Sequence, residues 1–216
     1  MTSRARKLRT RKFQALLRMV LCGTVLLSDV YAEDLAIQVP FWRAKEKVFR
    51  RITEDRDIIV SVTTEDLGAG KSVLHMKGGG LTRRELTSVF KEVQRYDQLL
   101  RITSHIREVR WNEPRKEMFL HCEAFNYHAR MTMKILVEEK PTPRLRFEVV
   151  EGDFLGMKGA FSFEEYKTTQ TVMGYAADYE YKKLPFPRFF VEFGLEVVLQ
   201  KVASLMRSFL EKQSSL

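Results

Sequence analysis

The stretch that decides the fold comprises the segments RLRFEVVE (144–151), GMKGAFSFEE (156–165), TQTVMGYAADYEYK (169–182) and RFFVEFGLEVVLQKVASLMRSFLEK (188–212). In the first three segments apolar and polar residues alternate, as in strands that bury one face. In the fourth, apolar residues recur every three to four positions, as in a helix. We therefore expect a curved antiparallel sheet with one long C-terminal helix packed in its concave face.

The sequence before this stretch predicts a further hairpin and further strands. IIVSVTTE (58–65) and SVLHMK (72–77) alternate in the same way around glycines at 68 and 70, which predicts a β-hairpin. We expect Gly78, Gly79 and Gly80 to end its second strand. The other expected strands cover residues 103–111, 117–125 and 127–139.

Three short helical segments complete the prediction. Thr82 and Glu85 have the spacing of a capping box, and apolar residues then recur at helical intervals up to Val93, which predicts a helix there. Weaker patterns indicate a helix over 43–52 and a helix or turn over 95–100. The order of elements indicates a single α+β domain.

Several of these segments resemble the START-like superfamily, which includes polyketide cyclases, START lipid-transfer domains and the coenzyme Q-binding COQ10 group. They are FKEVQRYDQL (90–99), the Gly-x-Phe-x-Phe strand at 159–163, and the alternation over 173–181 that leads through LPFP (184–187) into the last helix. The resemblance covers about residues 57–212. It implies a helix-grip fold and the binding of a hydrophobic small molecule, such as a lipid or isoprenoid, with no cofactor.

Strand parity predicts the side chains that face the last helix and line a ligand cavity. An inward apolar stripe is commonly only core, because burying each large side chain contributes about 1.5–3 kcal/mol. The methionines nevertheless suit a flexible apolar ligand, and the tyrosines offer hydroxyls to a polar headgroup. The candidate ligand-binding residues are Met131, Met133, Phe147, Met157, Phe161, Phe163, Met173, Tyr175, Tyr179, Val198 and Val202.

Catalytic and metal motifs are weak in this sequence. GAGKS (68–72) has Glu65 where a phosphate-binding loop requires its first glycine, and a strand rather than a helix follows. His121 and Cys122 point to opposite faces of a strand and, with His128, do not supply a tetrahedral zinc set. The predicted inward faces are nearly free of ionisable groups, so non-catalytic binding is favoured. A cyclase or hydrolase using the same pocket, and a protein-interaction module with a filled core, are the alternatives.

The N-terminus has the pattern of a secretory signal peptide. Residues 1–32 carry seven basic residues and one acidic residue, and thus +6 of the formal net charge of +9. An apolar run over 19–27 follows the basic stretch, and Val30 and Ala32 suit cleavage after Ala32. We expect a signal peptide (1–32), an N-terminal extension (33–56) and a ligand-binding domain (57–213).

This division of the charge bears on location and partners. Once the leader is removed, the remaining charge is modest, so nucleic acid is not an expected partner. A periplasmic or secreted location follows from the leader. Phe189, Phe190 and Phe193, at the start of the last helix, are candidates for a gating edge that touches a membrane transiently.

Overall fold

The computed structural model describes residues 42–43, 45–124, 127–182 and 188–212, all within a compact unit that extends from Pro40 to Leu216. The unit Met1–Val39, which contains the predicted leader, lies outside the described residues. The strands are β1 (Ile59–Gly68), β2 (Lys71–Thr82), β3 (Ile106–Asn112), β4 (Glu117–Ala124), β5 (Tyr127–Glu138), β6 (Arg144–Gly152), β7 (Lys158–Lys167) and β8 (Gln170–Tyr181). The helices are α2 (Glu46–Thr53), α3 (Leu86–Val93), the 3₁₀ turn η1 (Tyr96–Gln98), α4 (Leu99–Ile102) and α5 (Arg188–Lys212).

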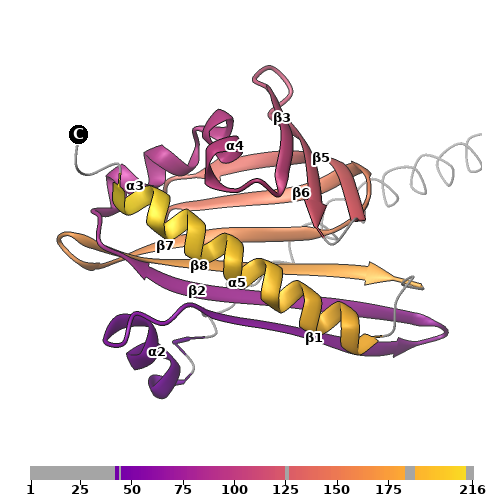
Figure 1. The fold of residues 1–216 in the computed structure, drawn as a ribbon, viewed down its shortest axis with the longest axis horizontal. Helices are drawn as coiled ribbons and strands as arrows, with labels where there is room; N and C mark the ends of the chain where they lie inside the picture. The colour runs from indigo at the N-terminus through magenta and orange to yellow at the C-terminus, as the bar shows by residue number, and fades with distance from the viewer. Residues whose placement is uncertain (1–41, 44, 125–126, 183–187, 213–216) are drawn as a thin grey trace, which may run out of the picture. The chain divides into compact units, whose positions relative to one another are not determined.

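All eight strands form one antiparallel sheet in the order β1-β2-β8-β7-β6-β5-β4-β3 (Figure 1). Neighbouring strands follow one another in the chain except for β2 and β8, whose pairing extends from Ser72 opposite Tyr181 to Thr82 opposite Thr171. This pairing joins the N-terminal hairpin to the last strand. The predicted helix-grip fold, with its strands and its long final helix, is confirmed.

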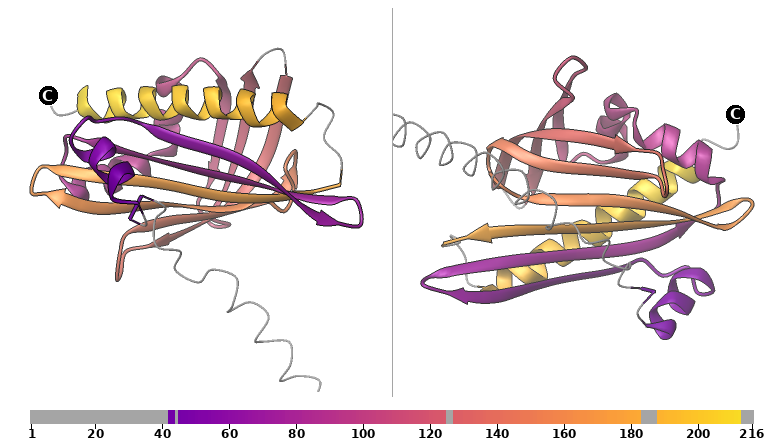
Figure 2. Two further views of the ribbon diagram at one scale, coloured as in Figure 1. Left: turned by 90° about the horizontal axis from the view of Figure 1, so that it is seen from below. Right: turned by 180° about the vertical axis from the view of Figure 1, so that it is seen from behind.

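Helix α5 lies along one face of the sheet, and the sheet curves toward it (Figure 2, left). The backbone N–H of Val62 on edge strand β1 donates a hydrogen bond to Glu196 Oε1 of α5, at 2.9 Å. At the other end of α5, Glu211 Oε1 accepts hydrogen bonds from the Arg56 guanidinium and from the Arg83 backbone N–H, at 2.6 and 2.9 Å. Leu210 beside it is fully buried with α3 residues. The C-terminal end of α5 is therefore firmly attached to the rest of the domain.

The opposite face of the sheet is covered in part by Trp42 and α2. The Trp42 side chain is 2% exposed and lies over Gly79 and Gly174, which are paired across β2 and β8. A Cβ at Gly174 would lie 1.8 Å from the Trp42 ring, so only glycine leaves room for the indole there. Ile52 of α2 completes this second packed layer together with Leu81 and Val172.

The triple glycine does not end β2, contrary to the sequence prediction. Gly78, Gly79 and Gly80 lie inside the strand and pair with Tyr175, Gly174 and Met173. Glycine weakens a strand through backbone entropy and the missing side chain, but it also marks places where another group approaches closely, as Trp42 does at Gly79. The strand therefore continues to Thr82.

The predicted capping box is also wrong. Thr82 is the last residue of β2 and is 1% exposed, and α3 begins four residues later, at Leu86. Glu85 occupies the N-cap position and has no capping hydrogen bond from its side chain. Its carboxylate instead accepts hydrogen bonds from the hydroxyls of Thr87 and Ser88. Strand pairing with Thr171 therefore outweighs the local capping signal at Thr82.

Replacing Gly174 should test the contact with Trp42. We expect Gly174→Ala to lower the free energy of unfolding by about 1–3 kcal/mol, because the added methyl displaces the indole. The control is Gly194→Ala in α5, where an added Cβ meets nothing within 4 Å and alanine favours the helix by about 1 kcal/mol. Urea unfolding of both variants measures the difference. Equal stability for the two variants would contradict the packing described here.

Candidate ligand-binding site

The concave face of the sheet carries an almost continuous apolar surface beneath α5. Its main cluster includes Met131 and Met133 of β5 and Met157 before β7, all buried. Tyr175, Tyr179 and Phe147 are partly buried and pack against this cluster, as do Val191, Leu195 and Leu199 of α5. The structure thus brings most of the predicted lining residues onto one surface, as strand parity predicted.

The predicted residues fall into two groups at different depths. Phe163 is 1% exposed and packs at the C-terminal end of α5 with Phe90, in an edge-to-face contact of 5.3 Å, and with Leu210. Met173 packs partly buried against the same cluster. These two residues belong to a closed core, whereas the aromatic residues nearer the middle of the sheet keep exposed surface. Val198 and Val202 are half-buried on α5.

Three aromatic rings surround the middle of the concave face. The centroids of Phe161 and Tyr175 are 5.0 Å apart, and those of Phe147 and Tyr175 are 6.3 Å apart with nearly parallel planes. The ring of Phe147 lies over Gly159, since its Cζ is 2.6 Å from the position that a Cβ would take there. Phe161 keeps 36% of its surface exposed although it projects from the concave face. The rings therefore border open space instead of filling it.

The hydroxyl of Tyr175 borders the same space. It makes no hydrogen bond in the described part of the chain. Unlike the hydroxyl of Thr82, which is fully buried without a partner there, the Tyr175 hydroxyl is not completely enclosed by protein atoms. Burial, and secondarily the carboxylate of Asp178, raise the pKa of Tyr175 well above its usual range. The phenol thus keeps its proton at neutral pH and can donate or accept a hydrogen bond. It is unsuited to act as a general base.

Cys122 lies on the concave face as well, opposite Ala129. It is a free thiol, and burial raises its pKa to about 11. Because the thiolate is the reactive form, this thiol is a poor nucleophile at neutral pH. It therefore behaves as an apolar residue of this face.

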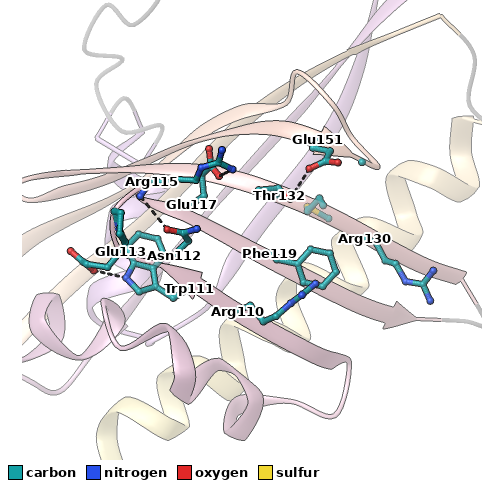
Figure 3. Close-up of a pocket in the computed structure, with 13 residues that line it drawn as sticks. Arg110, Trp111, Asn112, Glu113, Arg115, Glu117, Phe119, Arg130, Thr132 and Glu151 are labelled. Carbon is teal, nitrogen blue, oxygen red and sulfur yellow. Dashed lines mark hydrogen bonds and ion pairs between the residues drawn. The ribbon is translucent and has the colours of Figure 1, made fainter.

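A hollow of about 760 Å³ lies on the other, convex face, over β3, β4, β5 and the end of β6 (Figure 3). Its floor includes Phe119, and the Arg110 guanidinium lies 4.3 Å from the centre of that ring. The hollow is wide and its charges are largely paired, for example Arg110 with Glu108 and Arg115 with Glu117. Its lining is Arg110, Trp111, Asn112, Glu113, Pro114, Arg115, Glu117, Phe119, Arg130, Met131, Thr132, Glu151 and Gly152.

Parity alone did not indicate this hollow. Gly152 has a φ of +89°, and a Cβ there would lie 2.2 Å from the carbonyl oxygen of Arg130. The register between β5 and β6 shifts at this point, which bends the end of β6. Because Arg110 and Arg115 are about 67% and 71% exposed, the hollow offers mainly solvated side chains to a ligand. It is a weaker candidate than the concave face.

The weak catalytic and metal motifs remain weak in three dimensions. His121 Nε2 and His128 Nδ1 are 3.3 Å apart on the convex face, but no group of three potential metal ligands occurs among the described residues. The glycines of GAGKS form the β1–β2 turn, with φ of +77° at Gly68 and +72° at Gly70. This is the hairpin turn that the sequence predicted. No helix in the described part of the chain is long and apolar enough to cross a membrane.

Comparison with protein families matches residues 83–207 to the family described as polyketide cyclase / dehydrase and lipid transport. The match covers more than half of the chain, so the protein belongs to this family and, with it, to the START-like superfamily. The resemblance noted in the sequence is thereby confirmed. Comparison with curated protein sequences gave no significant match.

Solved structures share the fold at low sequence identity. A START superfamily protein from Mycobacterium smegmatis has a TM-score of 0.54 at 15% identity, covering 64% of this chain and 98% of its own. The Zhui aromatase/cyclase from Streptomyces sp. R1128 has a TM-score of 0.53 at 10% identity, covering 66% and 94%. Human STARD10 has a TM-score of 0.51 at 11% identity, covering 79% and 81%. At these identities the likeness establishes the fold alone.

Proposed function

We propose that this protein binds a hydrophobic small molecule, a lipid or isoprenoid, between the concave face of the sheet and α5, and carries it without chemical change. The observation that carries the proposal is the partly exposed aromatic surface around Phe161 and Tyr175, on the face that α5 covers. Membership in a family of cyclases, dehydrases and lipid-transport proteins is consistent with such a ligand.

The scarcity of carboxylates on the described strands of this face favours binding over catalysis. In the described strands, two carboxylates alternate onto the concave face. They are Asp66 and Glu165, and both lie near the ends of their strands. A cyclase would need a group that moves protons near neutral pH. Tyr175 and Cys122 hold their protons too tightly for that role, because burial raises the pKa of both. The carrier proposal therefore requires fewer assumptions.

Filling the space beside Tyr175 should abolish binding. Gly78 pairs with Tyr175, and a Cβ there meets only Ile59 O and Val60 Cγ2, both at 3.6 Å. We expect Gly78→Leu to fold normally and to lose at least about tenfold in affinity for the neutral dye Nile red, because the leucine occupies the ligand's space; tenfold corresponds to about 1.4 kcal/mol.

The matched control is Ala176→Leu, which places the same leucine side chain on the opposite face of β8, where Ala176 is exposed. Fluorescence titration measures the affinities, and thermal unfolding establishes that both variants are folded. Mass spectrometry of an organic extract of the wild-type protein identifies any ligand that co-purifies. A folded Gly78→Leu protein that binds the dye as the wild type does would contradict the proposed location.

Exposed apolar side chains at one end of the domain support a transient contact with a membrane. Phe193 and Val197 near the start of α5 are 57% and 43% exposed, and Leu155 in the β6–β7 loop is 61% exposed. The register of β6, β7 and β8 places that loop at the end of the sheet where β8 finishes and the chain leads to α5. The side chains at 189 and 190, also predicted to form this edge, lie outside the described residues.

Polar substitutions at this end should weaken membrane association. We expect Leu155→Ser with Phe193→Ser to reduce co-sedimentation with phosphatidylcholine vesicles several-fold, because each exposed apolar side chain contributes to insertion. Leu136→Ser is the control, since Leu136 is 55% exposed on the convex face of β5. Equal loss for the control and the double variant would exclude a specific contact at this end.

We also propose that the protein is exported, on the pattern of residues 1–32. N-terminal sequencing of the protein recovered from cells that produce the full chain should find Glu33 as the first residue. Leu21→Arg with Val25→Arg should leave the chain uncut, since charges interrupt the apolar run. A wild-type protein that starts at its original N-terminus would argue for a retained segment.

A further inference from the structure

We propose that the ligand carries an uncharged hydrogen-bonding group that meets the hydroxyl of Tyr175, and an aromatic ring system that packs against Phe147 and Phe161. This inference rests on the proposed function and narrows the chemical class of the ligand.

The first step is the unsatisfied hydroxyl. Tyr175 projects from the centre of the concave face, with Gly78 on one side and Phe161 on the other. Burying a polar group without a partner costs about 1–3 kcal/mol, so such groups normally find one. The described part of the chain supplies none, and the oxygen is not sealed off by protein atoms. A ligand or a water molecule must therefore satisfy it, and the apolar surroundings favour the ligand.

The second step is the shape of the space. Gly78, Gly159 and Ala177 are the smallest residues of the concave face near Tyr175. The Gly159 position is taken by the ring of Phe147, which leans across it, whereas no side chain takes the Gly78 position. The rings of Phe147 and Tyr175 differ by only 8° in orientation, whereas the ring of Phe161 is tilted by 40° and 44° from them. Stacked and tilted rings beside each other favour an aromatic ligand, because aromatic pairs gain about 0.5–1.5 kcal/mol beyond burial alone.

The third step is charge. In the described strands from β1, which carries Val60, across the sheet to β5, which carries Met131, no Lys, Arg or His side chain lies on the concave face. Glu196 of α5 accepts a hydrogen bond from the backbone N–H of Val62 on β1, and its carboxylate adds negative charge nearby. A ligand carboxylate or phosphate at Tyr175 would be buried with no cation on the neighbouring strands, which is strongly unfavourable. The polar group at this position is therefore neutral, such as an alcohol, a ketone or a phenol.

Three related probes test this inference: naphthalene, 1-naphthalenemethanol and 1-naphthoate, measured by displacement of Nile red. For the wild type we expect 1-naphthalenemethanol to bind more tightly than naphthalene, and 1-naphthoate at least about tenfold more weakly than the alcohol. In Tyr175→Phe the affinity for the alcohol should fall about 2- to 12-fold, the equivalent of one neutral hydrogen bond, while that for naphthalene is unchanged. Tyr166→Phe, on the opposite face beside Phe49, should change neither affinity.

The outcomes separate this inference from the proposed function. If Tyr175→Phe leaves the affinity for the alcohol unchanged, or if naphthoate binds as tightly as the alcohol, a neutral group at Tyr175 is refuted while hydrophobic binding stands. If neither the dye nor any probe binds the wild type, the proposed function falls and this inference falls with it. Thermal unfolding of Tyr175→Phe should show no loss of stability, since the removed hydroxyl has no partner in the described chain.

Discussion

The pairing of β2 with β8 is the constraint on which the rest of the domain depends. It joins an N-terminal hairpin to the last strand of a C-terminal meander over eleven matched residue pairs, from Ser72–Tyr181 to Thr82–Thr171. Because side chains alternate between the two faces of a strand, this single register determines both faces at once. Gly79 and Gly174 meet beneath Trp42 on one face, and Gly78 meets Tyr175 on the other.

Glycines of β2 and β8 leave room on both faces of the sheet, and the two faces differ in whether a side chain fills it. On the convex face Trp42 fills the room that two glycines leave, so that this layer is closed and contributes stability. On the concave face the room beside Gly78 is not filled by a neighbouring side chain, and the phenol of Tyr175 faces open space. A polar group without a partner in an apolar setting is costly for folding alone. That cost is offset where a bound molecule supplies the missing hydrogen bond.

Sequence patterns anticipated the strands, the final helix and the inward side chains, because period-2 and period-3.6 alternation reflect which face is buried. They failed at residues whose role depends on a distant partner. The triple glycine at 78–80 looks like a break in isolation, and only the contact with Trp42 and the pairing with β8 make it strand. Thr82 has the spacing of a helix cap, yet pairing with Thr171 keeps it in β2. Phe163 and Tyr175 project from the same face of the sheet. Packing against Leu210 buries Phe163, whereas the hydroxyl of Tyr175 is not fully enclosed.

The sequence by itself determined the fold class, the face on which each strand residue lies and the near absence of ionisable groups on the inward faces, since all three follow from local alternation and composition. Only the tertiary structure decided which inward residues are closed core and which border open space. That distinction depends on where Glu211 and Leu210 attach α5 to the rest of the domain and on which neighbours of Tyr175 are glycine. Alternation fixes the direction of a side chain, but the space in front of it is set by residues far away in the chain.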